Sequence, residues 1–234
     1  MADQKISNLA DGGLILAVDG PSGTGKSTMC RALAKKLDAK YVDTGAMYRV
    51  ATLAVLRAGV DPVDTDAVIE ATADLPLEVS DDPDSTAVLF AGEDVAREIR
   101  GPEVTQHVSA VSAIPQVRVN LVELQRKLAR EAGRAIVEGR DIGTVVLPDA
   151  PAKVYMTASA EVRAKRRFDQ DVAAGRDVDF DAVLADVKRR DEADSSRKTS
   201  PLRPADDAEI VDTSEMTPDE VLAALTAVVE RSAR

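Results

Sequence analysis

Residues 14–28 read LILAVDGPSGTGKST, and this stretch decides the fold. The run from Leu14 to Asp19 is short, apolar and bounded by glycine, which is typical of a strand buried in a parallel sheet. Gly20 to Ser27 follows at once and satisfies the pattern G-x-x-x-x-G-K-[ST]. Apolar side chains then recur at helical spacing from Met29 to Leu37. The order of strand, glycine loop and helix is the setting in which this pattern binds phosphate.

A loop of this kind captures an anion through its backbone. The glycines let consecutive N–H groups and the start of the following helix point at the same phosphate oxygens. Lys26 adds a charge at the β and γ phosphates, and the Ser27 hydroxyl can ligate Mg²⁺. An ordinary glycine-rich turn is the alternative, and the strand and helix on either side disfavour it. We therefore expect ATP to be bound by Gly20, Pro21, Ser22, Gly23, Thr24, Gly25, Lys26, Ser27 and Thr28.

Two carboxylates are candidates to orient Mg²⁺ through water. Asp19 and Glu138 both stand at the ends of apolar strands. Oxygen ligands suit Mg²⁺, and this ion keeps several of its waters. The alternative for each carboxylate is helix capping or pairing with a cation.

Composition limits the classes of protein that remain. The 234 residues suffice for one core with an insertion, and a net charge of −11 argues against a protein that coats nucleic acid. The single Cys30 excludes an internal disulfide, and with the single His107 it cannot hold zinc. The N-terminus lacks the features of a secretory signal, and no 18 consecutive residues are apolar. We expect a cytoplasmic monomer with neither nucleic-acid nor membrane partners.

The rest of the chain alternates between strand and helix patterns. Such alternation predicts an α/β fold with a parallel sheet. Between Asp61 and about Arg100 the pattern changes, and the runs at 75–80 and 86–90 predict a small β insertion. Further strands are predicted at 40–43, 135–138, 153–157 and 210–212. Helices are predicted at 46–58, 114–131, 160–174, 180–194 and 217–231.

Positive charge gathers late in the sequence. Residues 161–203 contain 11 of the 30 Lys and Arg residues and 10 acidic residues, so the acidic excess lies elsewhere. Arg163, Arg166 and Arg167 share one helical face. A second face carries Arg190, Asp194 and Arg197. Such faces are often merely solvated, but a protein that transfers phosphoryl between two anions needs arginines to neutralise their repulsion.

Five stretches of sequence stand out together. They are Asp19–Thr28, Asp43-Thr-Gly-Ala-Met-Tyr-Arg49, Gly92-Glu-Asp-Val95 with Glu98-Ile-Arg100, Glu138-Gly-Arg-Asp-Ile-Gly-Thr144, and Arg190-Asp191 through Pro201-Leu202. With these motifs the chain resembles the bacterial cytidylate kinases over about residues 14–230.

The resemblance implies a single domain, 1–234, with the three-layer fold of phosphate-loop kinases and a parallel five-stranded sheet. Its core would comprise about 13–60, 105–158 and 200–234. A nucleotide-acceptor insertion would cover about 62–104, and a helical, arginine-bearing lid about 159–199. The implied activity is ATP-dependent phosphorylation of CMP and dCMP in pyrimidine metabolism.

The resemblance also implies roles for individual residues. The expected catalytic side chains are Lys26, Arg140, Arg190 and Arg197, and the lid arginines Arg163 and Arg167 are expected to contact ATP, with Arg166 as a further candidate. The expected acceptor-binding residues are Thr44, Tyr48, Arg49, Ser109, Arg118, Arg140, Asp141, Arg190 and Asp194.

Asp141 is the residue expected to select cytosine. A carboxylate accepts a hydrogen bond from the cytosine 4-amino group, whereas uracil presents an acceptor oxygen there that a carboxylate repels. A salt bridge to a neighbouring arginine is the alternative for Asp141.

Other functions remain open on the sequence. The protein could be a kinase for UMP, dTMP or a metabolite hydroxyl. It could also be a nucleotide-dependent switch without catalysis, although no guanine-reading [NT]-K-x-D sequence occurs.

Overall fold

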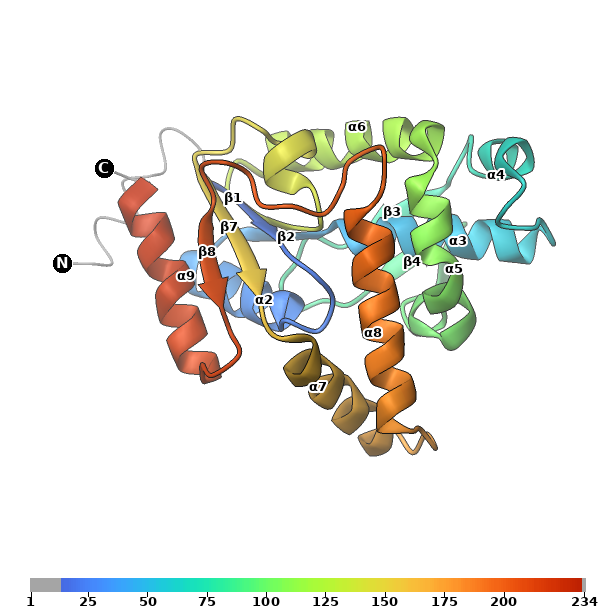
Figure 1. Cartoon of the computed structure of the whole chain (residues 1–234). Coiled ribbons are helices and arrows are strands. Elements are labelled where there is room, and N and C mark those ends of the chain that lie inside the picture. Colours follow the sequence, from blue (N-terminus) through green and yellow to red (C-terminus); the bar gives the residue numbers. More distant parts are fainter. Residues whose placement is uncertain (1–13, 233–234) are drawn as a thin grey trace.

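A five-stranded parallel sheet forms the centre of the computed structural model, which describes residues 14–232 (Figure 1). The strand order is β2-β6-β1-β7-β8, and every neighbouring pair is parallel. The predicted parallel sheet is thus confirmed. The strands are β1 (Ile15–Asp19), β2 (Lys40–Asp43), β6 (Ala135–Glu138), β7 (Ala152–Thr157) and β8 (Glu209–Asp212).

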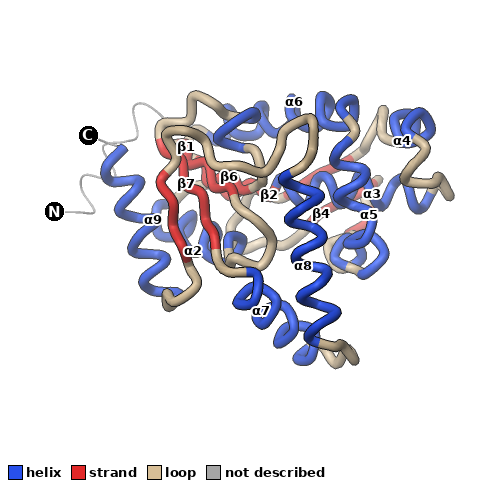
Figure 2. The backbone as a smooth tube through the Cα atoms, in the orientation of Figure 1, coloured by secondary structure: helices blue, strands red, loops and turns tan. Residues whose placement is uncertain are grey.

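Helices cover both faces of this sheet (Figure 2). Side chains alternate between the faces along β1. Leu16 and Val18 pack with helices α2 and α9, whereas Ala17 packs with α3 and α6 on the opposite face. The result is the predicted three-layer α/β arrangement. The covering helices are α2 (Lys26–Leu37), α3 (Thr44–Arg57), α6 (Pro115–Ala132) and α9 (Pro218–Ser232).

The parallel sheet gathers acidic side chains at one edge. Val18 of β1 and Asp43 of β2 both align with Glu138 of β6. Because parallel strands end at the same edge, Asp19, Asp43 and Glu138 lie near the start of the loop that follows β1.

The region between α3 and α5 contains a small antiparallel sheet, with strand order β3-β4-β5. Both strands predicted here are present in shorter form. Helix α4 was not predicted, although Asp64 caps it by accepting from the Ala67 amide at 3.2 Å. The elements are α4 (Thr65–Ala71), β3 (Leu77–Val79), β4 (Val88–Phe90), β5 (Glu93–Asp94) and the single turn η2 (Glu98–Arg100).

Helix α5 (Pro102–Ala113) has no counterpart among the helices predicted by range. Its sequence, PEVTQHVSAVSA, is rich in β-branched residues and serine, which have low helix propensity. Packing overrides propensity here, because Val104 contacts the insertion's core and Val108 and Val111 contact the core beneath α3. The helical turn η3 (Ile142–Val146) was likewise not predicted.

Helices α7 (Ala160–Ala173) and α8 (Phe180–Ser195) form a pair that extends beyond the sheet (Figure 1). They pack through a small apolar cluster containing Ala164, Val183 and Val187. Both helices were predicted within a residue of their ends. Within the described part of the chain, no helix combines the length and apolar character needed to cross a membrane.

Candidate active site

Glycine is required at the start of the loop between β1 and α2. Gly20 has a φ of +142°, and a Cβ there would lie 1.9 Å from the carbonyl oxygen of Met156. Gly23 and Gly25 also have positive φ values, of 84° and 90°. Helix α2 begins at Lys26, and the residue before it, Gly25, offers its amides no side-chain cap. These amides and the positive end of the helix dipole therefore face the loop, as an anion site requires.

Lys26 reaches back across the loop. Its Nζ donates to the carbonyl oxygens of Gly20 and Pro21, both at 2.8 Å. Burial and the positive charge of Arg140 lower the pKa of Lys26. A polyphosphate beside the ammonium would oppose that shift and favour the charged form.

Ser27 and Glu138 supply oxygens next to the loop. Ser27 Oγ donates to Glu138 Oε1 at 2.7 Å, and Glu138 Oε2 is buried without a hydrogen-bond partner within residues 14–232. Burial and the carboxylate of Asp43 raise the pKa of Glu138. A hydroxyl beside an unpaired carboxylate oxygen fits the donor set of a hydrated magnesium ion.

Asp19 makes different contacts from Glu138. Its two carboxylate oxygens accept the backbone N–H groups of Ile142 and Gly143, each at 2.7 Å. Burial outweighs these bonds and raises the pKa of Asp19 to about 6. Asp19 therefore caps a backbone turn, which was one of its two expected roles. Of the two carboxylates, Glu138 is the one that lines the cavity at the loop.

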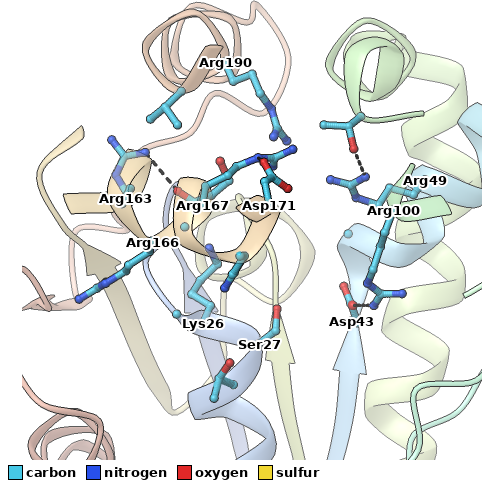
Figure 3. A pocket seen from close by; sticks show the side chains of 18 of the residues that line it. Lys26, Ser27, Asp43, Arg49, Arg100, Arg163, Arg166, Arg167, Asp171 and Arg190 are labelled. Carbon is cyan, nitrogen blue, oxygen red and sulfur yellow. Dashed lines mark hydrogen bonds and ion pairs between the residues drawn. The ribbon is translucent and has the colours of Figure 1, made fainter. Parts of the chain in front are cut away.

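A cavity of about 590 Å³ opens in front of the loop (Figure 3). Six loop residues line it: Ser22, Gly23, Gly25, Lys26, Ser27 and Thr28. Three expected ligands, Gly20, Pro21 and Thr24, do not line the cavity. The carbonyl oxygens of Gly20 and Pro21 accept from Lys26, and Thr24 is buried. Arg163, Arg166 and Arg167 of α7 complete the wall near the loop.

All three α7 arginines have protein partners, and Arg167 lies 3.7 Å from Asp171 on the same helix. Arg163 pairs with Asp191 of α8 at 2.5 Å and donates to the Ser22 carbonyl at 3.2 Å. Arg166 donates to the Thr213 carbonyl at 2.6 Å. Helix α7 is thereby tied to the phosphate loop, to α8 and to the segment after β8.

A second, smaller cavity of about 80 Å³ lies between α3, α5, α6 and α8. All nine residues expected to bind the acceptor line it, although they come from five separate segments. These residues are Thr44, Tyr48, Arg49, Ser109, Arg118, Arg140, Asp141, Arg190 and Asp194. Arg197, expected to be catalytic, lines this cavity as well.

Arg118 and Asp141 form a buried ion pair at this second cavity, and each side chain is 4% exposed. Arg118 also donates to the Ser112 carbonyl at 3.1 Å and lies over the Tyr48 ring, 5.0 Å from its centroid. The pair that was the alternative for Asp141 is therefore present. The ion pair is compatible with the expected role of Asp141 in binding cytosine, because both partners line the cavity.

Asp194 of α8 organises another side of the second cavity. Its Oδ2 accepts from Arg140 Nε at 3.2 Å, and its Oδ1 accepts from Ser109 Oγ at 3.4 Å. Arg197 Nε donates to the Asp194 carbonyl at 3.2 Å. Arg197 Nη2 and Arg190 Nε are buried without hydrogen-bond partners within the described residues. These N–H groups are available to an anionic ligand.

Arg49, Arg140 and Arg190 line both cavities and so mark their junction. Burial and the charge of Arg190 lower the pKa of Arg49 to about 9. Burial and the charge of Arg140 lower the pKa of Arg190. Three mutually repelling guanidinium groups favour a phosphate group placed among them.

Several residues at these cavities were not predicted from the sequence. Arg100 and Arg176 line the first cavity together with Asp171, and Ser112 lines the second. Arg100 belongs to the motif Glu98-Ile-Arg100, which the sequence shows, but the motif alone does not indicate that Arg100 lines a cavity. Arg176 follows α7 in a charged segment, where nothing separates a cavity residue from a solvated one.

Comparisons with known proteins agree over nearly the whole chain. A family model described as cytidylate kinase matches residues 16–231. The cytidylate kinase of Corynebacterium glutamicum is 73% identical over 222 residues, which is 95% of this chain and 96% of the relative. That of Corynebacterium efficiens is 71% identical over 225 residues, or 96% and 98% of the two chains. An uncharacterized protein from Eubacterium ventriosum shares the fold, with a TM-score of 0.55 and 13% identity over 94% of this chain and 99% of its own.

Proposed function

The chain belongs to the cytidylate kinase family, and on that premise we propose that it phosphorylates CMP and dCMP with ATP, giving CDP or dCDP and ADP. One observation supports this most strongly. A phosphate-loop cavity and a second cavity with a buried Arg118–Asp141 pair meet at three arginines. We name the first the donor cavity and the second the acceptor cavity.

The donor cavity is proposed to hold the triphosphate of ATP. Loop amides and the start of α2 would bind its phosphate oxygens, and Lys26 would neutralise charge at the β and γ positions. A Mg²⁺ ion held at Ser27 and Glu138 would supply positive charge to offset that of the phosphates. Ser27 would contribute its hydroxyl to the ion, and Glu138 would orient the ion's water through Oε2.

The acceptor cavity is proposed to hold the nucleoside monophosphate. Asp141 would accept from the cytosine 4-amino group while Arg118 holds the carboxylate in place. Ser109 would complete the base contacts. Asp194 would accept from the ribose, close to Arg190.

Transfer needs no general base in this scheme. The second pKa of a phosphate monoester is about 6, so the acceptor is largely ionised at neutral pH. Arg49, Arg140 and Arg190 would keep the two phosphate groups in line and neutralise the charge on the transferring group. Arg197 would add a charge from the acceptor side.

We further propose that residues 62–104 are the acceptor-side insertion and that 159–199 form a lid. The lid corresponds to the α7–α8 pair, whose arginines line the donor cavity. Closing this pair over both substrates would exclude water, which is the competing acceptor. The protein is proposed to act as a cytoplasmic monomer, without nucleic-acid or membrane partners.

Removing the lid arginines should affect turnover more than acceptor affinity. Arg163→Ala, Arg166→Ala and Arg167→Ala each remove a cation from the donor cavity but leave the acceptor cavity intact. We expect kcat to fall about 10- to 1000-fold, as for loss of one transition-state charge contact, while KM for CMP changes less. Steady-state kinetics at saturating ATP measure both. Unchanged kcat in all three variants would contradict the assignment of these residues to ATP.

The proposal is tested by following ADP and CDP together. With purified protein, ATP and Mg²⁺, ADP should form rapidly only when CMP is added, with CDP appearing in equal amount. A nucleotide switch would bind ATP without this dependence on an acceptor. Slow ADP formation that CMP does not accelerate would therefore reject the kinase assignment.

A further inference from the structure

The donor cavity contains a carboxylate that the proposed reaction does not use. Asp171, near the end of α7, lines the same cavity as Lys26 and Ser27 and lies close to Arg167 (Figure 3). Its side chain is only 11% exposed. A carboxylate in a cavity that binds a triphosphate repels this anionic ligand and so weakens its binding.

The contacts of Asp171 differ from those of the other acidic residues that line the cavity. Asp43 caps α3 by accepting from the Ala46 amide at 2.9 Å and has one cavity arginine nearby, Arg100 Nη2 at 3.5 Å, whereas Glu138 accepts from Ser27. The Asp171 carboxylate instead lies between two arginines of the cavity wall. One oxygen accepts from Arg176 Nη1, and the other lies 3.7 Å from Arg167 Nε.

A backbone hydrogen bond also holds Arg176 beside Asp171. The Arg176 N–H donates to the Asp171 carbonyl at 3.0 Å, in the turn that ends α7. Asp171 therefore offsets part of the positive charge of Arg167 and Arg176, both of which line the cavity. Guanidinium groups bind phosphate oxygens through the same N–H groups with which they bind a carboxylate. A triphosphate and Asp171 cannot both hold these groups fully.

We propose that Asp171 sets the donor affinity of this enzyme by competing with the phosphates of ATP for Arg167 and Arg176. The inference rests on the proposed function only in taking ATP as the donor. It assigns Asp171 a negative contribution to ATP binding, in contrast to the cationic residues around it. Without that contribution the arginine-rich cavity would bind the donor, and the diphosphate product derived from it, more tightly.

The same helix supplies a matched control. Lys165 and Asp169 also form an acid–base pair, with an Nζ–Oδ1 distance of 2.5 Å. Both side chains are more than half exposed, and neither residue lines the donor cavity. Asp169→Asn therefore removes the same charge from α7 without changing the cavity, and Asp171→Asn removes it within the cavity at nearly constant volume.

The test is calorimetric titration of each variant with ATP and Mg²⁺, without acceptor. We expect Asp171→Asn to lower Kd about three- to tenfold, as for removal of one nearby like charge, and Asp169→Asn to change it less than twofold. A thermal melt of each variant checks folding. Weaker or unchanged ATP binding by folded Asp171→Asn would overturn the inference, because Asp171 would then position the arginines rather than compete for them.

This readout is separate from the proposed function. If the protein bound ATP but did not phosphorylate CMP, the titration would still measure the effect of Asp171. Conversely, CMP-dependent turnover together with an unchanged Kd would retain the kinase assignment and reject the competition.

Discussion

Lys26→Met should abolish most of the phosphoryl transfer while leaving the fold intact. The ammonium is the one cation within the loop itself, and it lies beside carbonyl oxygens at the place proposed for the β and γ phosphates. Methionine keeps an unbranched side chain of similar length but removes the charge. Loss of one positioned electrostatic contact in a water-excluded site costs about 10²- to 10³-fold in kcat.

The measurement is single-turnover ADP formation with saturating CMP. Lys35→Met provides the control, because Lys35 is half exposed in the last turn of the same helix and pairs with Asp84 outside the cavity. Turnover of Lys26→Met within a few-fold of the unsubstituted protein, at equal thermal stability, would mean that the loop does not carry the chemistry.

Asp141→Asn should have the largest effect on the choice of acceptor. An amide can present either an acceptor or a donor to the base, so the rejection of uracil is lost. One well-placed base contact is worth about 1–3 kcal/mol of discrimination, which is roughly 5- to 150-fold in the ratio of kcat/KM for CMP to that for UMP. We expect this ratio to fall by that factor.

The same substitution should also destabilise the protein. Arg118 would remain buried without its anionic partner, and breaking a buried pair in this way costs about 3–5 kcal/mol. Ser109→Ala separates the two effects, because it alters the acceptor cavity without disturbing the Arg118–Asp141 pair. It should reduce CMP turnover with little change in melting temperature. An unchanged CMP preference in both variants, measured while they are folded, would refute the cytosine assignment.

The sequence predicts most of the core because local and long-range signals agree there. The strand at 15–19, the glycine loop and helix α2 follow from periodicity and from the demand for positive φ at Gly20, Gly23 and Gly25. Helix α5 was missed because its β-branched residues oppose helix formation, while burial of Val104, Val108 and Val111 against the core stabilises it.

The candidate site likewise has a part that can be predicted from local sequence and a part that cannot. The loop residues are contiguous in sequence, so the local pattern is enough to predict the conformation of the loop. Arg118 and Asp141 are 23 positions apart, and their pairing depends on how α6 packs beside the segment after β6. Asp19 caps a backbone turn, whereas Glu138 lines the donor cavity. The sequence could not distinguish these two roles, because both residues end a parallel strand and the difference depends on the turn at Ile142 and Gly143.

Asp171 shows a further limit of sequence reasoning. Its spacing from Arg167 predicts an ion pair on a helix face, and that pair exists. The spacing cannot show that this face lines the donor cavity rather than solvent, as the Lys165 and Asp169 pair on the same helix demonstrates. That distinction comes from the packing of α7 against the phosphate loop.

The most direct test of the central claim is a panel of acceptors. ADP formation is measured with ATP, Mg²⁺ and, in separate reactions, CMP, dCMP, UMP, AMP and dTMP, and kcat/KM is determined for each. CMP and dCMP should give the highest values, and UMP should be clearly poorer. If UMP, AMP or dTMP proved the best acceptor, the roles of Ser109, Arg118 and Asp141 in reading cytosine, and the assignment built on them, would be wrong.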